Sequence, residues 1–85
     1  MKKILIIDDN IAMQRSWFYE ARNLDVEIIE AVNIEGAECF FALNQDIDLI
    51  ALDACMSGNE INTVPLLKKM RESYKGPIVA ISNCP

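Results

Sequence analysis

An unbroken aliphatic run at residues 4–7 leads straight into two neighbouring carboxylates, Asp8 and Asp9. The run is too short for a helix and is rich in β-branched side chains, which is typical of a strand buried on both faces. Strands of this kind belong to parallel sheets, whose carboxyl ends open onto the crevice where α/β proteins bind ligands. The run therefore predicts a parallel sheet with two acids at its ligand-binding edge. The alternative is that the two aspartates only end the strand and begin a turn.

The same pattern returns twice further along the chain. The apolar residues 49–52 end on Asp53, and the apolar residues 78–81 end on Ser82. A further strand is predicted at residues 26–31. Apolar residues spaced three or four apart predict three helices, within residues 10–24, 33–43 and 64–74. This alternation of strands and helices predicts parallel βαβ units joined by right-handed crossovers.

Length and composition restrict the class of protein. The chain has 85 residues, of which 52% are hydrophobic, so we expect a single domain over residues 1–85 with a packed core. The net charge of −5 argues against nucleic acid or an anionic membrane as a direct partner, because both attract basic surfaces. The sequence shows neither the pattern of a signal peptide nor a transmembrane stretch. These observations predict a cytoplasmic protein.

The cysteines give no sign of a zinc site. Cys39, Cys55 and Cys84 are three in number, lack CxxC spacing, and occur in a chain without histidine. In a cytoplasmic protein we expect all three to be reduced thiols.

Parallel strands would bring Asp8, Asp9, Asp53 and Ser82 together at one edge of the sheet. Crowded carboxylates repel one another, which raises the pKa of at least one of them. A hard divalent cation removes this conflict, and oxygen donors without histidine or thiolate favour Mg²⁺. A carboxylate beside such a cation can act as a nucleophile toward phosphorus, and a hydroxyl can bind the phosphoryl oxygens. For Ser82 the alternative is a turn residue at the end of the strand.

Three segments in this order resemble a response-regulator receiver domain. They are ILIIDDN at the start, DLIALDACMSG in the middle and GPIVAIS near the end, and the spacing between them is close to that of the family. The resemblance implies a three-layer, flavodoxin-like open sheet of four parallel strands in the order 2-1-3-4, with three helices.

The resemblance also implies roles for individual residues. Asp53 would accept a phosphoryl group from a histidine kinase, a phosphotransfer protein or a small phosphodonor. Asp8 and Asp9 would hold Mg²⁺ together with Asp53 and the backbone carbonyl of Cys55. Ser82 would bind the phosphoryl group.

The sequence departs from the family in two places. After the acceptor, residues 56–61 read MSGNEI, without the proline and the second glycine that are usual in the family. The family's fifth strand and last two helices have no counterpart here, and neither has the lysine that ends the fifth strand. The chain therefore resembles a truncated receiver domain.

Two functional classes follow. The first is a phospho-accepting receiver of a two-component signalling system, which is not an enzyme in its own right. The second is a degenerate receiver that serves as a non-phosphorylated interaction module. A Mg²⁺-dependent phosphohydrolase is a third, weaker alternative. It would need a general acid or base near the acceptor, and the nearest candidate, Glu60, lies in a segment that reads as a loop.

The predicted topology also leads us to expect self-association. Right-handed crossovers place the first helix on one face of the sheet and the other two on the opposite face. Four strands about 4.8 Å apart span about 14 Å, whereas one helix covers about 10 Å, so part of one face stays uncovered. The uncovered side chains are Leu49 and Ala51 or Ile50 and Leu52, beside Val79 and Ile81 or Ile78 and Ala80. We expect a two-fold homodimer that buries this face or pairs the free edge of the fourth strand.

Overall fold

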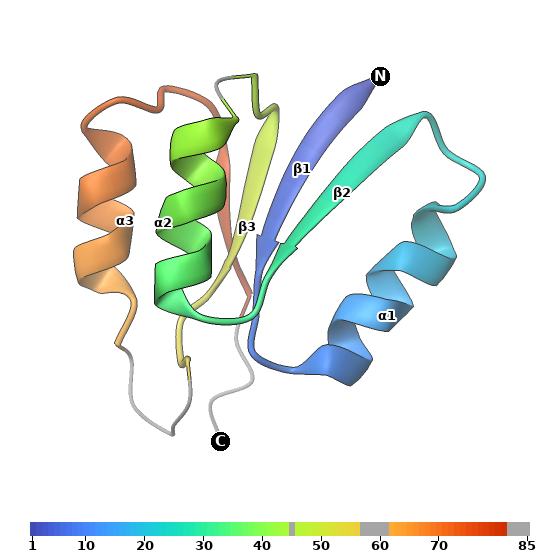
Figure 1. The fold of residues 1–85 in the computed structure, drawn as a ribbon, viewed down its shortest axis with the longest axis horizontal. Coiled ribbons are helices and arrows are strands. Elements are labelled where there is room, and N and C mark those ends of the chain that lie inside the picture. The colour runs from blue at the N-terminus through green and yellow to red at the C-terminus, as the bar shows by residue number, and fades with distance from the viewer. Residues whose placement is uncertain (45, 57–61, 82–85) are drawn as a thin grey trace.

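The computed structural model describes residues 1–44, 46–56 and 62–81, and contains all seven elements that the sequence predicts (Figure 1). The strands are β1 (Lys2–Ile7), β2 (Val26–Ala31), β3 (Leu49–Asp53) and β4 (Ile78–Ile81). The helices are α1 (Ile11–Ala21), α2 (Ile34–Leu43) and α3 (Val64–Arg71). Strands and helices alternate along the chain, as expected of βαβ units.

The four strands form one parallel sheet in the order β2-β1-β3-β4, which confirms the order implied by the resemblance. In the register of the central pair, Ile4 lies opposite Leu49 and Ile7 lies opposite Leu52. Asp53 lies opposite Ile81 in the neighbouring pair. All carboxyl ends therefore meet at one edge of the sheet.

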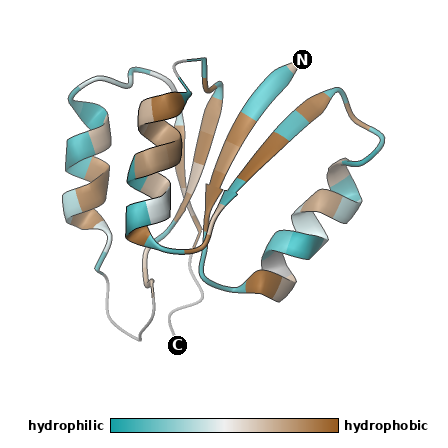
Figure 2. Cartoon of the chain, viewed as in Figure 1, coloured by the Kyte–Doolittle hydropathy of each residue, from teal (hydrophilic) through white to brown (hydrophobic). Residues whose placement is uncertain are grey.

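The main core fills the space between the sheet and the helices α2 and α3. Alternate strand residues point to this side, and Figure 2 shows how strongly hydrophobic the strands are. The buried members of the core are Leu5, Ile7, Ala31, Ala37, Ile47, Ile50, Leu52, Met56, Leu66 and Met70. Burying one such aliphatic side chain fully contributes about 1.5–3 kcal/mol. This cluster fixes how β1 and β3 lie beside each other.

Local signals set the starts of two helices. The side chain of Asn33 accepts a hydrogen bond of 2.6 Å from the Gly36 N–H, so it caps α2 as Asn, Asp, Ser and Thr commonly do. Pro65 lies in the first turn of α3, where its missing N–H has no helical partner to lose. Both helices thereby begin just after the carboxyl edge of the sheet.

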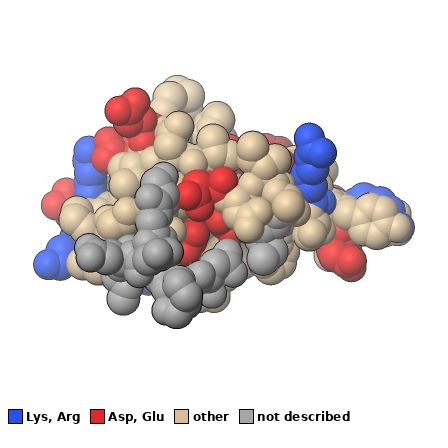
Figure 3. All heavy atoms as spheres, turned by 90° about the horizontal axis from the view of Figure 1, so that it is seen from below, with Lys and Arg blue, Asp and Glu red and all other residues tan. Residues whose placement is uncertain are grey.

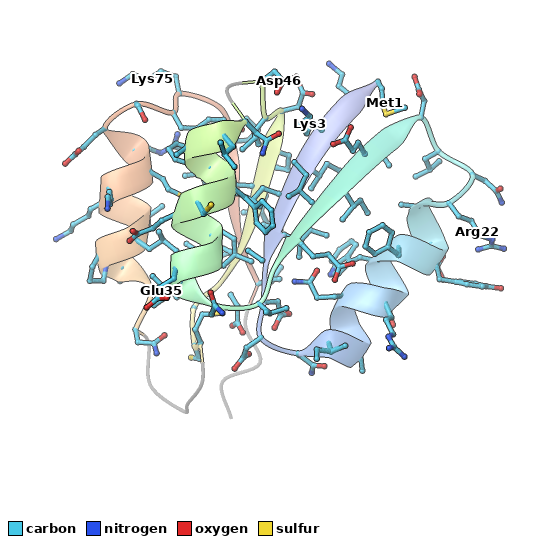
Figure 4. All side chains as sticks on the ribbon, in the orientation of Figure 1. Met1, Lys3, Arg22, Glu35, Asp46 and Lys75 are labelled. Carbon is cyan, nitrogen blue, oxygen red and sulfur yellow. The ribbon has the colours of Figure 1, made fainter. Side chains whose placement is uncertain are left out.

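The amino end of the sheet is closed by a network around Lys3. Its ammonium group donates to Asp46 Oδ1 at 2.9 Å and to Asn44 Oδ1 at 3.3 Å, and Figure 4 shows Lys3 beside Asp46. The backbone N–H of Lys3 donates to Asp48 Oδ2 at 2.8 Å. At this end Asp46 is thus paired with the Lys3 ammonium group, and Asp48 with the Lys3 backbone N–H.

No helix in the described part of the chain has both the length and the hydrophobicity needed to cross a membrane.

Candidate metal and phosphoryl site

Three carboxylates meet at the carboxyl edge of the sheet, as the sequence predicts. One oxygen each from Asp8, Asp9 and Asp53 lies within 4.8 Å of the others. Asp8 follows β1 directly and is 0% exposed, Asp53 ends β3 and is 2% exposed, and Asp9 is exposed. In a view onto this edge, Asp and Glu atoms lie at the middle of the surface as well as toward its sides, whereas the Lys and Arg side chains in view lie only toward the sides (Figure 3).

Asp8 is held firmly by the backbone around it. Its N–H donates to the Ala31 carbonyl at 3.0 Å, which extends the pairing of β1 with β2 by one residue. Its Oδ1 accepts a hydrogen bond of 2.9 Å from the Asn10 N–H. Its Oδ2 is buried and has no hydrogen-bond partner among the described residues. A buried carboxylate oxygen without a donor is costly unless a ligand or a proton compensates it.

Burial raises the pKa of Asp8 above its ordinary value, and the neighbouring carboxylates of Asp53 and Asp9 raise it further. The hydrogen bond from Asn10 acts in the opposite direction but does not cancel the shift. Because removal from water disfavours the charged form, a nearby cation would stabilise the ionised carboxylate of Asp8.

Residues at the start and the end of the loop that follows β3 hold Asp53 in place. Its Oδ1 accepts a hydrogen bond of 3.0 Å from the Cys55 N–H. Its carbonyl accepts one of 2.8 Å from the Thr63 hydroxyl, and Thr63 is itself buried. Asn62 pairs with the backbone of Met56 through both ends of its amide. These hydrogen bonds therefore join the start of the loop after β3 to its end.

Gln14, which is fully buried on α1, was not among the residues predicted for this site. Its Nε2 lies within hydrogen-bond distance of three carbonyls, those of Ile6 (3.3 Å), Asp8 (3.1 Å) and Ala31 (3.3 Å). The amide thereby joins α1 to the ends of β1 and β2. The only signal in the sequence is a glutamine adjoining the apolar stripe of a predicted helix, and this pattern is equally typical of a surface position.

The remaining predicted site residues have different outcomes. Cys55 contacts Asp53 through its N–H, and the role of its carbonyl stays a prediction. Ser82 and Glu60 lie outside the described residues. All lysines and arginines of the chain lie within the described residues, and none forms an ion pair with Asp8 or Asp53 there.

The expectation of three reduced thiols is wrong for one cysteine. Cys39 is a free and exposed thiol, whereas Cys55 is disulfide-bonded. Cys84 lies outside the described residues.

No protein-family model and no curated protein matches the chain. Among solved structures it is similar to the crystal structure of a response regulator receiver protein from Pseudomonas putida. The two structures superpose with a TM-score of 0.79 at 19% sequence identity, over 95% of this chain and 67% of that one. The chain therefore has the fold of a response-regulator receiver, which confirms the flavodoxin-like architecture expected from the motifs.

Proposed function

We propose that the chain is a phospho-accepting receiver domain of a two-component signalling system, with Asp53 as the acceptor. The observation that carries this proposal is the pair of buried carboxylates, Asp8 and Asp53, at the carboxyl edge of a receiver fold without a cation from the chain itself. Asp8 Oδ2 lacks any donor among the described residues. Such an arrangement suits a ligand that brings positive charge.

The donor set fits Mg²⁺. The residues that would hold it are Asp8, Asp9, Asp53 and the backbone carbonyl of Cys55, all of which offer oxygen and none of which offers nitrogen or sulfur. When bound, Mg²⁺ supplies positive charge that offsets the negative charge of the carboxylates and of an incoming phosphoryl group. The raised pKa of Asp8 is consistent with a site that is completed by such a charge.

The chemistry assigned to Asp53 is nucleophilic attack on phosphorus. One carboxylate oxygen forms a bond to the phosphorus atom, the bond from phosphorus to the donor's leaving group breaks, and the leaving group departs with the electron pair. The product on the chain is an acyl phosphate. The Cys55 N–H fixes Asp53 by its Oδ1, and the Ser82 hydroxyl is proposed to bind the transferred phosphoryl oxygens.

The physiological donor is proposed to be a histidine kinase or a phosphotransfer protein in the cytoplasm. The domain accepts a phosphoryl group and is not proposed to turn over a substrate as an enzyme. Because none of the lysines or arginines pairs with Asp8 or Asp53 in the described residues, we expect the acyl phosphate to form slowly or to be short-lived.

Acetyl phosphate with Mg²⁺ tests the proposal by intact-mass measurement. The wild type should gain the mass of one phosphoryl group, and Asp53→Ala should gain none. Asp46→Ala is the matched control, because it removes an aspartate from the opposite end of the sheet and should leave the modification unchanged. Modification that persists in Asp53→Ala would show that another residue is the acceptor.

A degenerate receiver that acts only as an interaction module is the second candidate. The position of the basic residues favours it, since the lysines at the amino end and on α3 pair with Asp46 and Glu38 and not with the buried carboxylates. Absence of any modification of the wild type, at Mg²⁺ concentrations that saturate the site, would select this function over phosphoryl transfer.

A further inference from the structure

The segment that carries two of the three acids is held by Gln14 at both of its ends. Residues 8–10 connect β1 to α1 and are called the acidic turn below. The backbone N–H of Gln14 donates to the carbonyl of Asn10 at 3.1 Å, and its side-chain amide donates to the carbonyl of Asp8 at 3.1 Å. Gln14 therefore binds the first and the last residue of the acidic turn.

The orientation of the Gln14 amide follows from its surroundings. Its Nε2 lies within hydrogen-bond distance of three carbonyl oxygens, those of Ile6, Asp8 and Ala31. A carbonyl oxygen can only accept, so the NH₂ end of the amide must face all three. The other end, Oε1, is buried and has no hydrogen-bond partner among the described residues. What this side chain contributes to the described structure is therefore its N–H donors.

The hydrogen bond to the Asp8 carbonyl acts on both acids of the turn. This carbonyl belongs to the planar peptide unit between Asp8 and Asp9, so holding its oxygen restricts the plane from which both residues extend. On the other side of Asp8, its N–H donates to the carbonyl of Ala31 at 3.0 Å, and Gln14 donates to that same carbonyl. Gln14 thus acts on the backbone of Asp8 both directly and through Ala31.

Asp53 is held by a different set of residues. Its carboxylate accepts a hydrogen bond from the Cys55 N–H, and its carbonyl accepts one from the Thr63 hydroxyl. One oxygen each from Asp8, Asp9 and Asp53 nevertheless lies within 4.8 Å of the others. This convergence requires the acidic turn, which is neither strand nor helix, to keep its position beside the end of β3.

We propose that Gln14 is a positioning residue of the cation site, which sets the affinity for a divalent cation by holding the acidic turn in place. The inference rests on the proposed function, because it presupposes that the three carboxylates bind Mg²⁺. Gln14 acts through the backbone of Asp8 and Asn10 and is not itself a ligand. Loss of a residue that orients metal ligands by hydrogen bonds typically weakens metal binding by about 10- to 100-fold.

Titration of Mn²⁺ followed by electron paramagnetic resonance tests the proposal, at a temperature at which circular dichroism shows all variants to be folded. Gln14→Met keeps a side chain of similar length without N–H donors and should bind Mn²⁺ about tenfold or more weakly than the wild type. Ile47→Ala is the matched control, because it leaves a cavity in the core near the amino end of the sheet and should destabilise the fold without changing the affinity.

The outcomes separate positioning from stability. Equal affinity of Gln14→Met and the wild type would overturn the proposal, and so would an equal loss of affinity in Ile47→Ala, which would attribute the effect to destabilisation alone. If Gln14→Met does not fold, Gln14→Asn takes its place with the same outcomes, since its amide is shorter by one methylene group. Absence of Mn²⁺ binding to the wild type would refute the proposed cation site and this inference with it, whereas unchanged binding in Gln14→Met refutes only the role of Gln14.

Amide hydrogen exchange in the absence of metal gives a second readout. The N–H of Asn10 donates to Asp8 Oδ1 at 2.9 Å within the acidic turn, and the N–H of Ala54 donates to the Ile81 carbonyl at 3.0 Å in a part of the edge that Gln14 does not contact. The exchange rate of Asn10 relative to that of Ala54 should rise about tenfold or more in Gln14→Met and stay unchanged in Ile47→Ala. An unchanged ratio in Gln14→Met would show that the turn keeps its position without the amide and would overturn the proposal.

Discussion

The two ends of the sheet treat the same kind of side chain in opposite ways. At the amino end, the hydrogen bond from Lys3 lowers the pKa of Asp46 below its ordinary value. At the carboxyl end, burial and the neighbouring carboxylates raise the pKa of Asp8. At the first end, Asp46 and Asp48 are paired with the ammonium group and the backbone N–H of Lys3, whereas at the second end Asp8 Oδ2 is buried without a hydrogen-bond partner among the described residues. The difference is what we expect if the carboxyl end holds the proposed cation, because its two buried carboxylates then gain a counter-charge that the amino end already has.

The largest expected effect is on metal binding. Asp8→Asn should weaken the binding of Mg²⁺ or Mn²⁺ by about 100-fold or more, since loss of a residue that merely supports a metal ligand already costs 10–100-fold. This corresponds to about 2.7 kcal/mol or more of binding free energy. Titration of Mn²⁺ followed by electron paramagnetic resonance measures it, with Asp46→Asn as the control. If Asp8→Asn and Asp46→Asn bound Mn²⁺ with equal affinity, the carboxyl end of the sheet would not differ from the amino end in metal binding.

The next effect concerns the buried amide that holds the carboxyl end together. Gln14→Met should lower the free energy of unfolding by about 2 kcal/mol, because it removes the two N–H donors that the buried carbonyls of Ile6, Asp8 and Ala31 share. Arg15→Met is the matched control, since its side chain is exposed on the same helix. Urea unfolding compares the two. A loss no larger than that of the control would mean that water replaces the amide without cost.

A smaller effect, of opposite sign, is expected from Asp8→Asn in the absence of divalent metal. This substitution should raise the free energy of unfolding by about 1 kcal/mol, because it removes a buried charge next to Asp53 and supplies an N–H₂ group. Thermal unfolding in a chelating buffer measures the change. A destabilised variant would indicate that the carboxylate is satisfied without a ligand.

The stabilisation expected from Asp8→Asn should depend on pH, because the pKa of Asp8 is raised. The Asp8 carboxyl binds its proton more tightly in the folded state than in the unfolded state. Its protonated form therefore stabilises the fold fully below pH 3.8, and this stabilisation is lost as the pH rises through the raised pKa. The advantage of Asp8→Asn should therefore be present near neutral pH and shrink as the pH falls toward 3.8. An advantage that does not change with pH would contradict the assigned cause.

The smallest effect is expected at the amino end. Asp46→Asn should lower the stability only slightly, because the ion pair with Lys3 is exposed on the side of the aspartate. The lowered pKa of Asp46 gives the opposite pH dependence: its contribution is present above pH 3.8 and is lost as the pH falls below that value. Thermal unfolding at low and high salt measures the loss, which should diminish in high salt. A large, salt-independent loss would mean that this end depends on more than the ion pair.

Much of the fold could be predicted because its signals are local. Short aliphatic runs that end on Asp8, Asp53 and Ser82 predicted the strands, and the cap of α2 at Asn33 was visible as a residue type at the right place. The meeting of Asp8 and Asp53 followed from parallel topology alone. The order of the strands did not follow from any local signal and came from the resemblance.

The supports of the site could not be predicted, because they depend on the packing of distant segments. Gln14 reaches carbonyls on two strands only once α1 has docked on the sheet. Thr63 and Asn62 lie in a segment that reads as a loop, and their partners in and after β3 are fixed by the path of the chain. A polar side chain in such a place has no periodicity that distinguishes a buried support from a solvated surface residue.

The central position of β1 has a consequence for biosynthesis. β1 is made before β2 and β3, yet it lies between them in the sheet, and its Ile4 pairs with Leu49. At about 5–20 residues per second, the chain waits about 2 to 10 seconds between making β1 and making its second neighbour. During that interval β1, α1 and β2 present an unpaired strand edge and an apolar face that α3 has not yet covered. We therefore expect the nascent chain to be a substrate for chaperones that hold exposed β-strands until residue 53 has emerged.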